Sequence, residues 1–172
     1  EQDAHLLKLK SLCRFRQSLK KSKARLKIQL SGYVNLLFPE LLSFFKSGIH
    51  ISTCYTLLKR CSSPAEIAAL RLDSLSRLLS NASRGRFSRS TAEALKSLAK
   101  SSVGVKNPYI SIQIAQTIQQ IELLEQQIDE IENVIKDTIC ELDSVIMSIP
   151  GIGAIDGAMI LGEIGNIDRF AS

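Results

Sequence analysis

Apolar residues recur at helical spacing near the start of the chain. Leu12, Leu19, Leu26 and Tyr33 follow one another at seven-residue intervals, with lysines and arginines at many positions between them. Such a stripe predicts an amphipathic helix over about residues 6–37. Pro39 should end this helix, because proline lacks a backbone donor and disfavours helical backbone in the residue before it.

The longest periodic run covers residues 109–149, which contain no Gly or Pro. Apolar side chains repeat there at seven-residue intervals, and sustained heptads predict a coiled-coil helix. We expect self-association through these positions, which are Ile114, Ile121, Ile128, Ile135 and Leu142. The partner is either the first helix of the same chain or a second copy. Asn107 and Pro108 are placed to begin the helix.

The stretch between the two long helices predicts several short ones. Ser63-Pro64-Ala65-Glu66 has the spacing of a capping box with Pro at the first helical position. Ser90-Thr91-Ala92-Glu93 repeats that spacing. Asp73 is placed to cap another short helix.

The segment Ser148-Ile149-Pro150-Gly151-Ile152-Gly153 has the pattern of a helix-hairpin-helix turn. Pro150 should stop the preceding helix, while Gly151 and Gly153 permit positive φ and close approach of another backbone. The turn and the next helix N-terminus would then bind a phosphate. A tight turn between two packed helices explains the same residues, and Asp156 without a nearby Lys or Arg weakens the phosphate interpretation.

These elements predict an all-α fold of long coiled-coil helices with a small helical insertion and the start of a helix-hairpin-helix. The expected segments are a basic long helix (1–39), a helical insertion with a basic turn (40–107), an acidic coiled-coil helix (108–149) and a truncated hairpin (150–172). Aromatic residues make up only 5%, with no Trp, which argues against an aromatic-rich β-sandwich. A length of 172 residues fits one domain or two.

Charge changes sign along the chain, although the total is only +5. Residues 1–30 hold nine basic and two acidic residues, a net +7, and residues 31–108 hold eleven and four, again +7. Residues 109–149 hold one basic and eight acidic residues, a net −7. A basic face can bind nucleic acid, and an acidic helix can neutralise a basic one, so the charges also favour pairing of the two long helices, with the orientation left open between parallel and antiparallel.

The basic turn at residues 83–89 is the first candidate for nucleic-acid binding. Arg84, Arg86 and Arg89 surround Phe87, so phosphate contacts with stacking by Phe87 are one interpretation. In the other, Phe87 packs in the core and the arginines are only solvated. A second candidate is the lysine cluster of the first helix, which either contacts phosphates or complements the acidic helix; its members are Lys20, Lys23 and Lys27.

Catalytic motifs are absent from the sequence. There is no Walker loop, no G-x-G-x-x-G after a strand and no H-E-x-x-H. His5 and His50 belong to no recognisable motif with acidic or cysteine partners, so we expect ordinary histidines. The four scattered cysteines predict buried, reduced thiols of a cytosolic protein rather than a metal site or a disulfide scaffold. No apolar run is long enough to predict a membrane span.

Several motifs together resemble the IS-one-ten/Piv family of transposases, which are RNA-guided DNA recombinases. Residues 149–170 look like the opening of the family's C-terminal domain. Leu12-Cys13-Arg14-Phe15-Arg16 and Phe38-Pro39-Glu40-Leu41 are similar to the helix that follows its RuvC-like domain. The segment between is similar at Ser63-Pro64-Ala65-Glu66-Ile67 and Ala82-Ser83-Arg84-Gly85-Arg86-Phe87.

The resemblance implies a region between a RuvC-like DEDD domain, which holds divalent metal such as Mg²⁺, and a C-terminal domain with a nucleophilic serine. DNA and a structured guide RNA are the implied partners, and the implied location is the cytoplasm of a bacterium or archaeon. The chain lacks an initial Met and is expected to be a fragment. We assign no catalytic residue, metal ligand or cofactor to residues 1–172, and expect a non-catalytic scaffold for subunit assembly and RNA or DNA binding.

Two other functions fit the same sequence. A pure coiled-coil oligomerisation module would use its charges only between helices and bind no nucleic acid. A helix-hairpin-helix module of a DNA repair protein would need a complete second helix after the turn.

Overall fold

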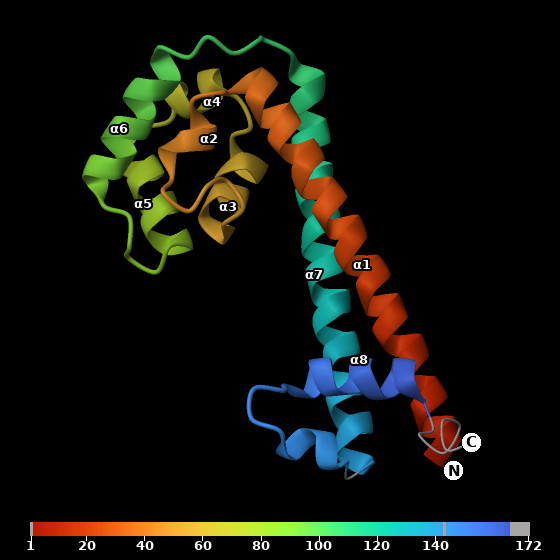
Figure 1. The fold of residues 1–172 in the computed structure, drawn as a ribbon. Coiled ribbons are helices and arrows are strands. Elements are labelled where there is room, and N and C mark those ends of the chain that lie inside the picture. The colour runs from red at the N-terminus through yellow and green to blue at the C-terminus, as the bar shows by residue number, and fades with distance from the viewer. Residues whose placement is uncertain (1, 143, 166–172) are drawn as a thin grey trace. The chain divides into compact units, whose positions relative to one another are not determined.

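The computed structural model describes residues 2–142 and 144–165, and within these ranges the regular elements are all helical (Figure 1). The predicted all-α fold is confirmed. The α-helices are α1 (Gln2–Leu37), α2 (Leu41–Phe44), α3 (Ser52–Arg60), α4 (Pro64–Ala69), α5 (Leu72–Ala82), α6 (Arg89–Lys100), α7 (Pro108–Glu141) and α8 (Ala154–Ile164), and a 3-10 helix, η1, covers Val145–Ser148.

The chain divides into two compact units, each with its own core. The terminal unit consists of Glu1–Ala24 and Glu122–Ser172, and the central unit of Arg25–Ile121. Helices α1 and α7 each contribute residues to both units.

In the terminal unit, α1 and α7 pack antiparallel. Leu9 and Cys13 of α1 are buried in one cluster with Ile135 and Ile139 of α7 and with α8. Two ion pairs flank this cluster: Arg16 Nη2 lies 2.6 Å from Glu132 Oε1, and Lys23 Nζ lies 3.6 Å from Glu125 Oε1. Residue numbers rise along one helix as they fall along the other. The pairing of basic and acidic helices that the charges favoured is therefore present within one chain.

Helix α7 ends at Glu141, so the helix predicted to continue to Ile149 is too long. The Leu142 N–H bonds to the Ile139 carbonyl, and Ser144 has extended backbone. The Ser144 hydroxyl accepts a hydrogen bond from the Ile146 N–H at the start of η1. Serine side chains compete with helical hydrogen bonds in this way, which heptad periodicity does not reveal.

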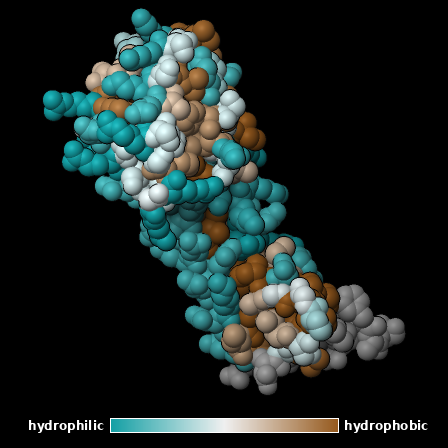
Figure 2. Space-filling view, turned by 90° about the vertical axis from the view of Figure 1, so that its left-hand side faces the viewer, coloured by the Kyte–Doolittle hydropathy of each residue, from teal (hydrophilic) through white to brown (hydrophobic). Residues whose placement is uncertain are grey.

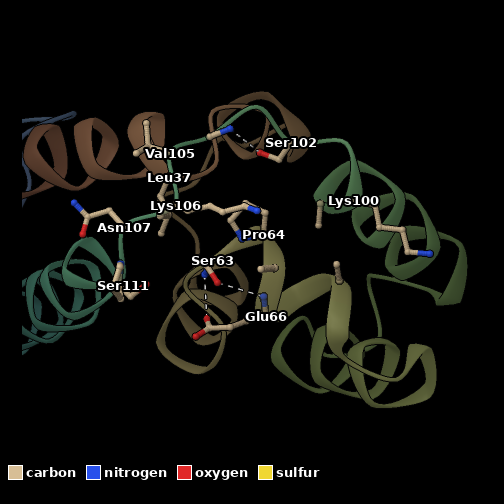
Figure 3. A pocket seen from close by; sticks show the side chains of 15 residues that line it. Leu37, Ser63, Pro64, Glu66, Lys100, Ser102, Val105, Lys106, Asn107 and Ser111 are labelled. Atoms are coloured by element: carbon tan, nitrogen blue, oxygen red, sulfur yellow. Dashed lines mark hydrogen bonds between the residues drawn. The ribbon is translucent and has the colours of Figure 1, made fainter.

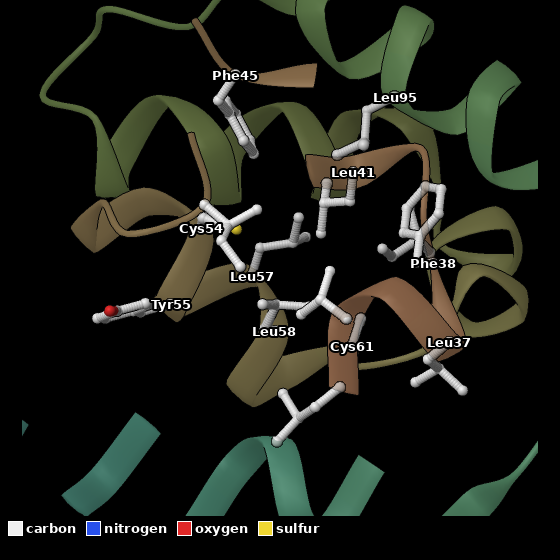
Figure 4. Packing of buried hydrophobic residues seen from close by; sticks show 14 of the residues in the cluster. Leu37, Phe38, Leu41, Phe45, Cys54, Tyr55, Leu57, Leu58, Cys61 and Leu95 are labelled. Carbon is white, nitrogen blue, oxygen red and sulfur yellow. The ribbon is translucent and has the colours of Figure 1, made fainter. Parts of the chain in front are cut away.

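The core of the central unit gathers the end of α1, the short helices and the start of α7. Phe38, Leu41, Leu57, Leu58 and Leu95 are fully buried there (Figure 4). Burial of such side chains contributes about 1.5–3 kcal/mol each in transfer free energy. Their packing fixes the short helices, which are too short to be stable alone.

Before α7, the predicted helix boundaries hold at two places and fail at two. Helix α1 ends before Pro39, and Ser63 forms the predicted capping box with Glu66. Asp73, however, lies inside α5, and α6 begins at Arg89 without a side-chain cap, so these two predicted caps are wrong. The Asp73 carboxylate instead bonds Arg89, a partner distant in sequence.

Candidate nucleic-acid interface

The basic turn between α5 and α6 has a defined backbone. Arg84 and Gly85 both have left-handed conformation, with φ of 54° and 83°. The Gly85 N–H donates to the Ser80 carbonyl at 2.8 Å, and the Phe87 N–H donates to the Ser83 hydroxyl at 2.9 Å. Left-handed arginine is uncommon and is stabilised here by these closing bonds. The side chains of Arg84 and Arg86 are exposed.

Phe87 belongs to the core rather than to the exposed face. Its ring is half-buried, with its centroid 5.2 Å from that of Phe45. The Arg86 guanidinium carbon lies 5.7 Å from the Phe87 ring centroid, which is within cation–π range. The predicted stacking of Phe87 on a base therefore has no support, whereas Arg86 is held at the surface by the ring beneath it.

Arg89 differs from its two neighbours because carboxylates already surround it. Its guanidinium donates to Asp73 and its Nε lies 3.5 Å from Glu93 Oε1. The hydrogen bond to Asp73 and the charge of that carboxylate raise the pKa of Arg89. Of the three predicted arginines, Arg89 is thus the one whose charge is neutralised locally.

A depression between α3 and α5 adds two arginines that the sequence did not single out. It has a volume of about 330 Å³ and its lining includes Arg60, Arg77, Thr56, Ser74 and Asn81. Ser74, Arg77 and Asn81 lie on one face of α5, since their spacing is helical. Guanidinium, hydroxyl and amide groups are the usual donors to phosphate oxygens, and no carboxylate lines this depression.

The lysine cluster on α1 is used in different ways along its length. Lys20 is exposed, Lys27 is half-buried and Lys23 pairs with Glu125 as described above. For Lys23 the structure supports the complementing role between basic and acidic helices.

The hairpin glycines adopt different conformations. Gly151 has φ of 90°, which favours glycine, while Gly153 has an ordinary φ of −81° and precedes α8. Asp156 lies in the first turn of α8, and its Oδ2 is 3.9 Å from the position a Cβ on Gly153 would take. A carboxylate beside this turn opposes a bound phosphate. Residues 166–172 of the resembling segment lie outside the described residues.

The heptad residues of α7 are packed within the single chain. Ile114 and Ile121 belong to the core of the central unit, and Ile135 to that of the terminal unit. Ile128 is 5% exposed and Leu142 is half-buried. Their apolar surface is therefore already covered without a second copy.

Exposed apolar side chains gather instead on the surface of the C-terminal hairpin (Figure 2). Val145 is 81% exposed and Ile149 is 48% exposed. Scattered apolar side chains are normal at a surface, so this feature alone assigns no role.

A second cavity lies in the central unit beside the connection from α6 to α7 (Figure 3). Its volume is about 670 Å³, and its lining includes Ala65, Ala68, Ala99, Pro64 and Pro108. Hydroxyls of Ser63, Ser102 and Ser111 and the amide of Asn107 add polar groups, and Lys100 and Lys106 also line it.

Glu40 anchors the connection that forms one wall of this cavity. Its carboxylate accepts hydrogen bonds from the Ser102 hydroxyl at 2.7 Å and the Val103 N–H at 2.9 Å. Burial opposes ionisation of Glu40, but these hydrogen bonds together hold its pKa below the usual value. The Val105 N–H donates to the Leu36 carbonyl at 2.8 Å, so Glu40 and Leu36 together fix this wall at two points.

His50 forms a structural network and not a nucleophile–base pair. Its Nε2 lies 3.1 Å from the Ser31 hydroxyl and its Nδ1 lies 2.9 Å from the Tyr55 hydroxyl. The Ser31 hydroxyl also donates to the Lys27 carbonyl at 3.0 Å. A serine whose proton is bound to a backbone carbonyl is not activated for attack.

Other chemistry is sparse in the part of the chain that the structure describes. No group of three His, Cys, Asp or Glu side chains there has the arrangement of a metal site. None of its helices is both long and apolar enough to cross a membrane. Three cysteines are buried as predicted, but Cys140 is exposed, which corrects that expectation for one thiol.

Comparison with known proteins identifies the C-terminal segment. Residues 143–172 match the family described as Transposase IS116/IS110/IS902 family. Curated proteins and solved structures gave no match. The family match confirms the predicted resemblance at its C-terminal part, residues 149–170. Residues 143–172 are thus similar to the IS116/IS110/IS902 family of transposases.

Proposed function

We propose that this chain is a nucleic-acid-binding scaffold of a transposase, with the basic face of the central unit as its phosphate-contacting surface. The observation that carries the proposal is the way in which acidic side chains are bound in this part of the chain. Residues 31–108 hold only four acidic side chains and eleven basic ones. Neighbouring groups of the central unit already engage all four, which are Glu40, Glu66, Asp73 and Glu93.

That pattern leaves the other arginines of this segment in excess. Arg89 alone takes both Asp73 and Glu93, so it shields the neighbouring arginines from two carboxylates. Arg84 and Arg86 remain exposed on the turn, and Arg60 and Arg77 remain in the α3–α5 depression. Unneutralised arginines on one compact unit provide the electrostatic footprint of phosphate binding.

Fluorescence anisotropy with a labelled structured RNA and a labelled DNA duplex tests the proposal at several salt concentrations. Binding should weaken steeply with salt, because phosphate contacts release counterions. The double variant Arg84→Ala/Arg86→Ala should lower the salt slope for duplex DNA by about two if each arginine neutralises one phosphate. Arg60→Ala/Arg77→Ala should act in the same direction.

A charge-matched control separates local contacts from total charge. Lys8→Ala/Lys136→Ala removes two positive charges from exposed positions of the terminal unit. We expect its affinity and salt slope to stay near those of the unchanged protein. Equal losses in the control and in the arginine variants, or no binding at low salt, would contradict the proposed surface.

In this proposal DNA is one partner of the transposase, which the family match supports, and a structured guide RNA is the other. A preference for structured RNA over a duplex of equal length in the same titration supports the RNA role. The repair-module alternative predicts duplex preference and dependence on Gly151, which the variant Gly151→Ala tests in parallel.

Self-association is the remaining part of the scaffold role and the main alternative to it. Sedimentation velocity measures whether the chain is a monomer or a larger species. Because Ile128 and Ile135 are buried within one chain, changing either to Asp should disrupt the α1–α7 pair rather than release a folded monomer. A stable dimer that separates into folded monomers in these variants would favour the oligomerisation module.

A further inference from the structure

The cavity beside the α6–α7 connection has the chemistry of a small-ligand site. Its volume of about 670 Å³ lies within the roughly 300–1,000 Å³ typical of such sites. Small side chains make the room, because Ala65, Ala68 and Ala99 line it. Proline rings of Pro64 and Pro108 add flat apolar surface. A ligand with a flat, largely apolar body fits this lining.

A cation extends over the same cavity. The Lys106 side chain reaches across it toward Pro64, whereas the Lys100 ammonium points away (Figure 3). The single carboxylate in the lining belongs to Glu66, and it accepts a hydrogen bond from the Ser63 N–H at 3.1 Å within the capping box. No ion pair engages Lys106 in the described part of the chain. The ligand should therefore also carry a negative charge.

The cavity wall is preformed. A Cβ added to Gly104 would lie 1.9 Å from the Leu37 carbonyl oxygen, so the connection runs directly against the end of α1. The Glu40 and Leu36 hydrogen bonds described above hold it on both sides of Gly104. A fixed wall reduces the ordering cost of binding.

We propose that this cavity accepts one unpaired nucleobase of a bound nucleic acid, with a flanking phosphate on Lys106. The inference rests on the proposed nucleic-acid function and names a site within it. A concave site is closed to a paired base, while a bulged or loop base is free to leave the stack. The Ser111 hydroxyl and the Asn107 side-chain NH2 are the groups for the base edge, because the Ser102 hydroxyl already donates to Glu40 and Asn107 Oδ1 already accepts from the Tyr109 N–H.

Hairpins with a single bulged nucleotide test the site, prepared in RNA and in DNA. Each is compared with the same hairpin carrying an abasic bulge and with the fully paired hairpin. Burial of roughly 40 Å² of apolar base surface against such a lining gives about a five-fold gain in affinity. We expect the unchanged protein to bind the bulged hairpin that much more tightly than the abasic one, and the RNA and DNA arms show which backbone is preferred.

Two variants localise the effect. Ala65→Leu fills the cavity from an exposed position, and Ala94→Leu is the matched control on α6, outside the lining. Ala65→Leu should abolish the difference between the bulged and abasic hairpins, while Ala94→Leu should keep it. Lys106→Gln should weaken binding of both hairpins and lower the salt slope by about one.

The outcomes separate this inference from the proposed function. Equal binding of bulged and abasic hairpins, with the Arg84→Ala/Arg86→Ala loss intact, overturns the base site and leaves the phosphate surface standing. Persistence of the difference in Ala65→Leu also overturns the base site. Absence of all binding at low salt overturns both.

Discussion

Substitution of Gly104 by alanine should measurably destabilise the protein. The added Cβ would lie 1.9 Å from the oxygen and 2.5 Å from the carbon of the Leu37 carbonyl. Close-packed interiors do not tolerate such contacts, so the connection must move by about 1 Å. The neighbour is backbone near the end of α1, which has no alternative rotamer to adopt.

The magnitude follows from the hydrogen bonds on either side of Gly104. The Val105 N–H lies 2.8 Å from the Leu36 carbonyl oxygen, and the Val103 N–H lies 2.9 Å from Glu40 Oε1. A shift of about 1 Å stretches both beyond the usual range of about 2.7–3.2 Å. Each bond contributes about 0.5–1.5 kcal/mol, so the expected loss is about 1–3 kcal/mol. For a chain of this size, that lowers Tm by roughly 2–12 °C.

Thermal unfolding followed by circular dichroism at the helical band measures this change. Gly32→Ala is the matched control, because Gly32 lies inside α1 with nothing within 4 Å of its added Cβ. Alanine is favoured over glycine in a helix by about 0.5–1 kcal/mol, so the control should raise Tm. A Tm for Gly104→Ala equal to or above that of the unchanged protein would refute the close approach.

Three further outcomes are expected. Arg89→Ala should weaken nucleic-acid binding by about two- to five-fold, because it frees Asp73 to pair with Arg77, one turn along α5. Adding Asp73→Asn to this variant should restore affinity in anisotropy titrations. Failure of that rescue would mean that Arg89 contacts phosphate itself. Burial raises the pKa of Cys54 to about 12, so alkylation of the native protein at pH 8 should modify the exposed Cys140 and spare Cys54. Mass spectrometry identifies the modified thiols, and rapid labelling of both would contradict the packing around Cys54. The hydrogen bond from Arg14 lowers the pKa of Glu163, so this pair stabilises the fold above the unfolded pKa of about 4.3 and stops doing so as pH falls through the lower folded pKa. Glu163→Gln should therefore flatten the dependence of Tm on pH in that window. An unchanged profile would rule the pair out as a contributor to stability.

Features set by neighbouring residues were predictable from the sequence. Pro39 ends α1 and Ser63 caps α4 because both effects act within one helical turn. The pairing of the basic and acidic helices within one chain also followed from their charges, whereas charge and periodicity did not set its antiparallel direction. The exclusively helical composition of the described residues has the same origin.

Features that depend on distant partners were not predictable in this way. Arg60 and Arg77 share a depression only because α3 lies beside α5. Asp73 looked like a cap, but its partner Arg89 lies beyond the basic turn. The end of α7 at Glu141 depends on Ser144, whose side-chain bond outweighs the continuing heptad pattern. Local patterns contain no information about which of two satisfactory partners a polar group takes.

The division of the chain into units has a consequence for the order of events during synthesis. The central unit, Arg25–Ile121, is continuous and can fold as soon as it leaves the ribosome. The terminal unit joins the two ends of the sequence, so Leu9 and Cys13 stay uncovered until Ile135 and Ile139 are made. At about 5–20 residues per second, that interval lasts roughly 6–25 s. The first helix is therefore the part of the nascent chain with the longest need for protection against aggregation.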